Sequence, residues 1–260
     1  MSISFLEETL TLASQELLNR FNHSLSIDVK SDFSIVTDAD LASEKIILER
    51  IHKYFPKDKI FSEESGMSAK RQEGDYYWIV DPLDGTTNYS RSYPFFCVSI
   101  ARAKVVSGIF EPILGGVINP IGSKMYIAEK GGGAFCNGKK MDISGPAPEF
   151  NKSYLCTGFY YNRGKELEED IIRFSKVAAC CQPIRRDGAA ALDLALTAEG
   201  IFDGFWEKGL KPWDIAAGCL LVTESGGVVR SYESGDYHVE QQGIISGRES
   251  TVRRIAELIL

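Results

Sequence analysis

The sequence predicts an α/β (α+β) fold in which layers of helix pack on layers of sheet. Two observations carry this prediction. Amphipathic helix patterns open and close the chain, and short β-type runs separate the helical segments between them. The 260 residues are 44% hydrophobic and 25% charged, which suits one sizeable core or two subdomains that share one. The turn-rich segment 145–153 predicts a boundary between subdomains 1–147 and 148–260.

The first half begins with helix and continues as sheet. Apolar residues recur at steps of three and four over residues 4–21, and Ser4 and Glu7 have the spacing of a capping box. A second helix is expected from Asp40 to Tyr54. Sheet strands are expected next within 76–80, 95–105, 112–118 and 124–142, and Asn137-Gly138 is a strong signal for a tight turn between two strands.

The second half alternates between the two kinds of element, as layered packing requires. Ile171, Ile172 and Phe174 are among the apolar positions of one of its helices. The expected strands are 153–161, 201–206, 227–232 and 243–245, and the expected helices are 165–179, 188–198, 213–224 and 249–260.

Composition argues against several classes of function. The net charge of −7 and the pI of about 5.2 argue against direct binding to nucleic acid through bulk charge. The first residues lack a basic leader, and no window approaches the roughly 20 apolar residues of a membrane span. Six cysteines without a C-x-x-C pair, and only three histidines, argue against a zinc site. We therefore expect a cytoplasmic protein with reduced cysteines.

The most informative stretch runs from Asp81 to Asn88 and reads DPLDGTTN, directly after the apolar run YYWIV. Proline disfavours the α region for the preceding residue, so we expect Asp81 at the exposed end of a buried strand. Asp84 follows across a turn, where both carboxylates can bind a hard cation such as Mg²⁺. Gly85 permits close approach of the backbone, and a helix that opens after it would offer N–H groups to a phosphate. The motif D-x-x-D-G alone is also typical of an ordinary turn.

Other acidic residues are ambiguous when they are taken singly. Glu63-Glu64 is typical of a solvated surface pair, and Asp214 after Trp213 is typical of a helix N-cap. Capping and solvation also account for Asp32 and Asp38, which precede the second helix.

Together these segments resemble the inositol monophosphatase family, in the bacterial branch of inositol-1-monophosphatases and fructose-1,6-bisphosphatase-like enzymes. The resemblance implies a layered α/β/α/β/α sandwich of the sugar-phosphatase type that assembles as a homodimer. It also implies a Mg²⁺-dependent, lithium-sensitive hydrolase that acts on a small phosphorylated polyol or sugar. The matching segments, in family order, are Val36–Asp40, Glu63–Ser65, Asp81–Asn88, Arg185–Asp193, Gly204–Asp214 and Trp213–Gly218.

The resemblance implies a metal-binding role for five residues. Glu63, Asp81 and the main-chain carbonyl of Leu83 would hold one Mg²⁺. Asp81, Asp84 and Asp214 would hold a second ion, and Glu63 would help with a weaker third.

Catalytic and substrate-binding roles follow in the same way. Thr86, paired with Asp40, would orient the attacking water, and Glu63 would act with them. The backbone of Gly85 and Thr86 would bind the phosphate. The residues that would contact the rest of the substrate are Gly188, Ala190, Glu207 and Asp214.

Two residues depart from the family pattern. Ser62 stands where the family often has glycine, and Asp187 stands where bacterial relatives often have threonine or serine. An acid at position 187 puts the choice of substrate in doubt, because it would repel a phosphorylated ligand unless it points away.

Several alternatives stay open at this point. Fructose-1,6-bisphosphatase activity is the first, and histidinol phosphatase activity is the second. A third, from a different class, is a regulatory binding protein that acts on the transcription machinery. Glu207 would favour a monophosphorylated polyol, because its carboxylate accepts hydrogen bonds from hydroxyls and repels a second phosphate, unless Arg185 or Arg186 compensates nearby. The other reading of Glu207 is a surface ion pair with Lys208 or Lys211.

Overall fold

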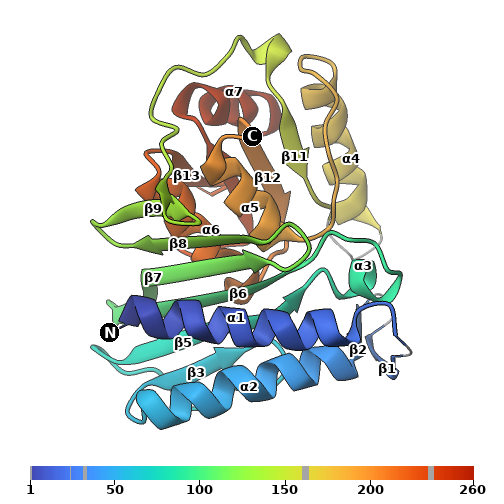
Figure 1. Cartoon of the computed structure of the whole chain (residues 1–260). Coiled ribbons are helices and arrows are strands. Elements are labelled where there is room, and N and C mark those ends of the chain that lie inside the picture. Colours follow the sequence, from blue (N-terminus) through green and yellow to red (C-terminus); the bar gives the residue numbers. More distant parts are fainter. Residues whose placement is uncertain (1, 24, 32–33, 160–163, 234–236) are drawn as a thin grey trace.

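The computed structural model describes residues 2–23, 25–31, 34–159, 164–233 and 237–260. In this part of the chain, helices and sheets alternate in five layers (Figure 1), as the predicted α/β/α/β/α sandwich requires. The first layer is α1 (Ser2–Arg20) and α2 (Asp38–Tyr54), the middle layer is α5 (Ala190–Glu199) and α6 (Pro212–Glu224), and the last is α4 (Lys165–Ala178) and α7 (Glu249–Ile259).

The two sheets between these layers are mostly antiparallel. The larger has the strand order β10-β9-β8-β7-β6-β5-β3-β4, and the smaller has the order β11-β12-β14-β13. The parallel pairs are β3 with β5 and β11 with β12. The bounds are β3 (Lys59–Ser62), β4 (Gly66–Met67), β5 (Tyr76–Asp84), β6 (Cys97–Val106), β7 (Ile109–Asn119), β8 (Lys124–Glu129), β9 (Gly133–Cys136), β10 (Lys139–Lys140), β11 (Leu155–Thr157), β12 (Gly204–Lys208), β13 (Val228–Ser231) and β14 (Gly243–Gly247).

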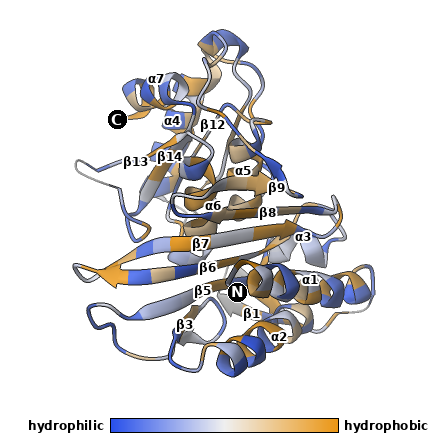
Figure 2. Ribbon diagram, turned by 60° about the vertical axis from the view of Figure 1, so that its left-hand side comes forward, coloured by the Kyte–Doolittle hydropathy of each residue, from blue (hydrophilic) through white to orange (hydrophobic). Residues whose placement is uncertain are grey.

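Strand β5 lies inside the larger sheet and is buried on both faces. Tyr77 and Ile79 join the core beneath α5 and α6, whereas Trp78 and Val80 join the core beneath α1 and α2. This division follows from the two-residue period of a strand. Because both faces are covered, the first five residues, Tyr76–Val80, are all apolar or aromatic rather than alternating with charged residues. Figure 2 shows β5 in the sheet between β3 and β6.

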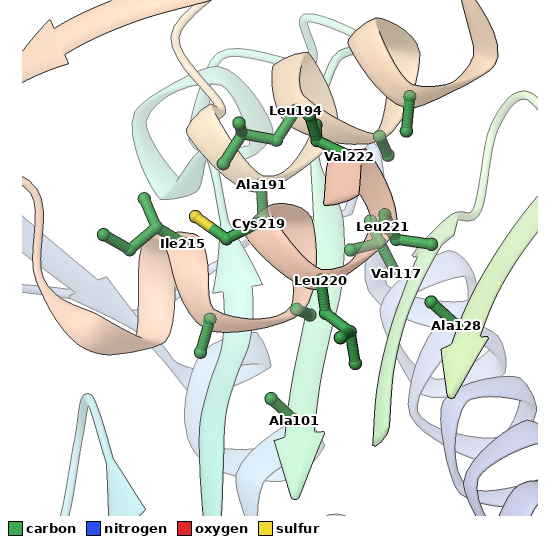
Figure 3. Packing of buried hydrophobic residues seen from close by; sticks show 14 of the residues in the cluster. Ala101, Val117, Ala128, Ala191, Leu194, Ile215, Cys219, Leu220, Leu221 and Val222 are labelled. Carbon is green, nitrogen blue, oxygen red and sulfur yellow. The ribbon is translucent and has the colours of Figure 1, made fainter. Parts of the chain in front are cut away.

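Small residues bring α6 close to both of its neighbours. A Cβ on Gly218 would lie 2.5 Å from Cβ of Leu194 in α5, and a Cβ on Gly115 in β7 would lie 3.0 Å from Cα of Ala217. Figure 3 shows the side chains of α6 packed between α5 and the sheet. The close packing that the small residues after Asp214 predicted is confirmed, and it fixes the first turn of α6.

Several predicted boundaries were wrong. Helix α1 begins at Ser2, so Ser4 lies inside the helix and does not cap it. The strand expected at 201–206 runs from Gly204 to Lys208, and the β segment expected at 124–142 consists of β8, β9 and β10. The Asn137-Gly138 turn is confirmed, with both residues at positive φ between β9 and β10. Ile171 and Ile172 of α4 are more than half exposed.

The amino-terminal half contains a β-hairpin in addition to the predicted elements. The hairpin of β1 (Ile27–Ser31) and β2 (Ser34–Thr37) was not predicted, although Ile27 and Val29 alternate with polar residues as in a strand. Asp32, which was read as a capping or solvated acid, lies outside the described residues.

No helix in the described ranges is long and apolar enough to cross a membrane. The division at residues 147 and 148 stays a prediction.

Candidate active site

A cavity of about 420 Å³ opens where the end of β5 meets the first turns of α5 and α6. Its wall also includes the short helix α3 (Thr86–Ser90) and the end of β12. The structure therefore brings together segments that lie more than 150 residues apart in the sequence. The predicted site residues that line it are Glu63, Asp81, Leu83, Asp84, Gly85, Thr86, Gly188, Ala190, Glu207 and Asp214.

The two aspartates of the motif both belong to β5, which runs on to Asp84 through a bulge in its pairing with β6. Asp81 is 1% exposed, so the prediction that it sits at an exposed strand end was wrong. Its Oδ1 accepts a hydrogen bond of 3.0 Å from the backbone N–H of Leu83. The Oδ2 of Asp84 accepts one of 2.7 Å from the N–H of Ala191 in the first turn of α5. Both carboxylates are thus held by backbone donors.

Gly85 makes the turn from β5 into α3. Its φ of 89° lies in the left-handed region, and a Cβ there would be 3.0 Å from the carbonyl oxygen of Phe95 and 3.2 Å from Cβ of Ala189. Glycine is needed both for the conformation and for the space. The expected helix start after Gly85 is confirmed, and it points the first turn of α3 at the cavity.

The predicted pairing of Thr86 with Asp40 is present. The Oγ1 of Thr86 lies 2.9 Å from Oδ1 of Asp40 and 3.0 Å from the carbonyl oxygen of Leu83, and it donates its one hydrogen to either acceptor. Asp40 is fully buried behind the cavity wall and does not line it. Its Oδ2 accepts hydrogen bonds from the N–H and the hydroxyl of Thr37, which closes a capping box at the start of α2.

Asp214 and Glu207 enter from the carboxyl-terminal half of the chain. Asp214 is the third residue of α6, not its N-cap, and its Oδ2 accepts a 2.6 Å hydrogen bond from the N–H of Lys211. Glu207 on β12 packs against Gly158, where an added Cβ would lie 2.1 Å from the Glu207 carboxyl atoms. Among the described residues Glu207 forms no ion pair with Lys208 or Lys211, so the surface-pair reading is wrong.

Burial and neighbouring negative charges raise the pKa of three aspartates in the cavity. Burial raises the pKa of Asp81 well above its usual range, and the charges of Glu63, Asp84 and Asp214 raise it further. Burial likewise raises the pKa of Asp84 to about 7 and that of Asp214 well above its usual value. Four acids that repel one another in a half-closed cavity form a site of strongly negative potential.

The donor set suits a hard divalent cation. Carboxylate and carbonyl oxygens are the ligands that Mg²⁺ prefers, and a cation would relieve the repulsion among the acids. In the described ranges, no group of three or more His, Cys, Asp or Glu side chains is already gathered as a ready-made metal site. The cavity residues therefore fit a divalent cation through the chemistry of their oxygen ligands and through their negative charge.

Four residues near the site were missed by sequence reasoning. Ser43 and Glu44 lie three and four positions after Asp40, a spacing that places them on the same helix face and could have identified them. Asn88 donates hydrogen bonds of 2.8 Å to the carbonyls of Phe95 and Asp187, which ties α3 to the segment before α5. Cys97 is buried, and its Sγ lies 3.6 Å from Oδ2 of Asp84.

The two departures from the family pattern have local explanations. Ser62 is fully buried, and its hydroxyl donates to Glu44. Asp187 is half-buried and is not among the residues that line the cavity. Burial raises the pKa of its carboxyl, and Arg185 opposes that rise.

The metal-free protein should lose stability as the pH rises from about 4 to about 7. Asp84 has a higher pKa folded than unfolded, so the folded state binds more protons in that window and the free energy of unfolding falls with pH. Asp84→Asn keeps an oxygen for Ala191 and removes the charge. At pH 8 it should therefore raise the stability of the metal-free protein by about 1–4 kcal/mol. The measurement is thermal unfolding in a chelator at pH 5 and pH 8.

Asp142→Asn is the matched control, because that carboxyl is exposed and its pKa is lowered by Ser144. It should leave the slope between pH 5 and pH 8 unchanged. An Asp84→Asn protein that is less stable than the wild type at pH 8 would contradict the electrostatic account.

Comparison with known proteins identifies the family of this chain. A model of the inositol monophosphatase family matches residues 2–259. The inositol-1-monophosphatase of Synechocystis sp. is 41% identical over 199 residues, which cover 76% of this chain and 67% of that protein. The Nus factor SuhB of Pseudomonas aeruginosa is 36% identical over 238 residues, which cover 90% and 86%.

Solved structures show the same relationship. The extragenic suppressor protein suhB from Bartonella henselae is 34% identical, with a TM-score of 0.91 over 99% of this chain and 98% of that one. The inositol monophosphatase from Anabaena sp. is 34% identical, with a TM-score of 0.84 over 98% and 93%. With the family model matched from end to end and the same fold in these relatives, the chain belongs to the inositol monophosphatase family, a family of phosphatases.

Proposed function

We propose that the protein is a Mg²⁺-dependent phosphomonoesterase that hydrolyses myo-inositol monophosphate or a similar sugar or polyol phosphate. The observation that carries the proposal is the meeting of Asp81, Asp84 and Asp214 in one cavity with the Gly85 turn. Membership of a phosphatase family supports the reaction class. The Mg²⁺ dependence and the identity of the substrate belong to the proposal.

The metals would be held as the family resemblance implies. Glu63, Asp81 and the Leu83 carbonyl are assigned to the first Mg²⁺, and Asp81, Asp84 and Asp214 to the second, with Glu63 available to a third. When bound, Mg²⁺ would neutralise the phosphate and lower the pKa of the attacking water. Burial of Asp81 and Asp84 supports this assignment, because buried charges need a compensating partner.

The remaining groups would position the reactants. With the carboxylate of Asp40 accepting the Thr86 hydrogen, the Thr86 oxygen keeps a lone pair for a proton of the attacking water. The backbone N–H groups of Gly85 and Thr86 would bind the phosphate. Gly188, Ala190 and Glu207 would contact the rest of the substrate.

Some properties rest on the family resemblance alone. These are the assembly as a homodimer and inhibition by lithium, a small hard cation that could replace a weakly held Mg²⁺. The cytoplasmic location rests on the composition of the sequence. A structure of staphylococcal inositol monophosphatase-1 is described as a LiCl-soaked inhibitory complex, but that chain is 22% identical and supports the fold alone. Fructose-1,6-bisphosphatase and histidinol phosphatase activities remain alternatives for the substrate.

A second candidate function is binding to the transcription machinery. Relatives from Pseudomonas aeruginosa and Salmonella typhimurium are named Nus factor SuhB, at 36% and 38% identity. Each acid of the proposed metal site is present in this chain, which argues against an inactive binding protein. Catalysis and partner binding can coexist.

Asp81→Asn should abolish phosphatase activity while leaving the fold intact. Asp81 is assigned to both metals, so its loss should lower kcat/KM with inositol-1-phosphate by on the order of 10²–10³-fold or more. The measurement is phosphate release with and without Mg²⁺, together with circular dichroism and the melting temperature. A capture experiment with the same variant separates partner binding from catalysis.

Asp142→Asn provides the matched control and should keep wild-type turnover. Substantial Mg²⁺-dependent turnover by folded Asp81→Asn would refute the assignment of Asp81 to the metals.

Glu207→Gln should weaken recognition of the polyol more than it weakens hydrolysis. A hydrogen bond between a carboxylate and a substrate hydroxyl contributes about 1.5–3 kcal/mol, or roughly 10–150-fold in kcat/KM. Glutamine keeps an acceptor oxygen but loses the charge, so Glu207→Gln should lose part of this contribution. We expect that loss with inositol-1-phosphate and a much smaller one with an aryl phosphate that lacks hydroxyls. The measurement is kcat/KM for both substrates in the wild type and the variant.

Glu257→Gln on α7 is the control, because that side chain is 53% exposed. If both substrates lose equal efficiency in Glu207→Gln, or if neither loses any, Glu207 does not contact the polyol.

A further inference from the structure

One face of α2 contacts three separate segments of the cavity wall. Asp40, Ser43 and Glu44 occupy positions i, i+3 and i+4 of the helix and therefore share a face. Asp40 accepts a hydrogen bond from Thr86, and the hydroxyl of Ser43 donates one of 2.8 Å to the carbonyl of Pro82, between the two aspartates of β5. All three helix side chains are at most 8% exposed. The face is thus a buried surface that supports the site from behind.

Glu44 contacts the third segment, which contains Glu63. Its Oε1 accepts hydrogen bonds from the hydroxyl of Ser62 at 2.5 Å, the N–H of Ser65 at 3.1 Å and the hydroxyl of Ser65 at 3.0 Å. Ser62 directly precedes Glu63, and Ser65 follows two residues after it. One carboxylate oxygen therefore fastens the chain on both sides of Glu63, whose own N–H donates to the carbonyl of Val80 in β5.

The chemistry of Glu44 argues for a role beyond filling space. A buried carboxylate is costly unless it is hydrogen-bonded, and an apolar side chain would fill the same volume at a lower cost. Among the described residues, the hydrogen bonds that offset the cost of burying Glu44 all come from Ser62 and Ser65. These hydrogen bonds fix the geometry of the segment from Ser62 to Ser65.

We propose that Glu44 is a positioning residue that holds Glu63 in place for metal binding. The inference rests on the proposed function, in which Glu63 is a metal ligand. Groups that orient a ligand through hydrogen bonds typically alter metal affinity about 10–100-fold when they are removed. Ser62, which departs from the family pattern, supplies one of the three donors.

The test titrates metal-free protein with Mn²⁺ alone and measures bound ion by electron paramagnetic resonance. Glu44→Ala should weaken Mn²⁺ binding by about 10–100-fold. Glu44→Gln should lie between the wild type and Glu44→Ala, because its amide oxygen still accepts from Ser62 and Ser65. Steady-state assays should show a higher Mg²⁺ requirement, with kcat restored to within a few-fold at saturating Mg²⁺. If Glu44 had a purely structural role, its replacement would lower the melting temperature without raising the Mg²⁺ requirement separately from kcat.

Glu49→Gln is the matched control, since it lies on the same helix with its side chain 69% exposed, and it should bind Mn²⁺ like the wild type. If Glu44→Ala does not fold, Glu44→Gln and Ser65→Ala decide the question by the same titration. If the folded Glu44 variants bind Mn²⁺ as tightly as the wild type, and the wild type is active, the positioning role is overturned and the proposed function is not. A wild type that neither binds Mn²⁺ nor releases phosphate would instead refute the proposed function and, with it, this inference.

Discussion

The burial of like charges at the end of β5 is the constraint on which the rest of the site depends. Asp81 and Asp84 are 1% and 8% exposed, and both lie close enough to Glu63 for its charge to raise their pKa. Such a cluster destabilises the metal-free fold as its members ionise. The surrounding protein limits this cost with backbone N–H donors from Leu83 and Ala191.

The layers of the fold bring the members of that cluster together. The bulge at the end of β5 sets both aspartates in the strand that separates the two main cores. The close approach of α6, which Gly218 permits, delivers Asp214 from the other half of the chain. On the opposite side of the sheet, α2 holds the Pro82 carbonyl and the segment around Glu63. Helices on both faces of one sheet thus support a single cavity.

The sequence predicted the layered architecture and the residues of the cavity better than it predicted local geometry. Asp81 and Asp214 were recognised because their motifs match a family, whereas each alone is typical of a turn or a cap. The proline rule placed Asp81 at an exposed strand end, but a bulge carries β5 on to Asp84. The spacing of Glu44 from Asp40 places both on one helix face, but its contacts with Ser62 and Ser65 depend on tertiary packing that the sequence does not reveal. The β1–β2 hairpin was missed although Ile27 and Val29 alternate with polar residues, a two-residue period that indicates a strand.

The most direct test of the account is anomalous diffraction from crystals of the wild-type protein soaked in Mn²⁺. The account predicts anomalous peaks inside the cavity, with one ion against Glu63, Asp81 and the Leu83 carbonyl and another against Asp81, Asp84 and Asp214. Crystals that hold Mn²⁺ elsewhere but show no peak beside Asp81 would contradict it.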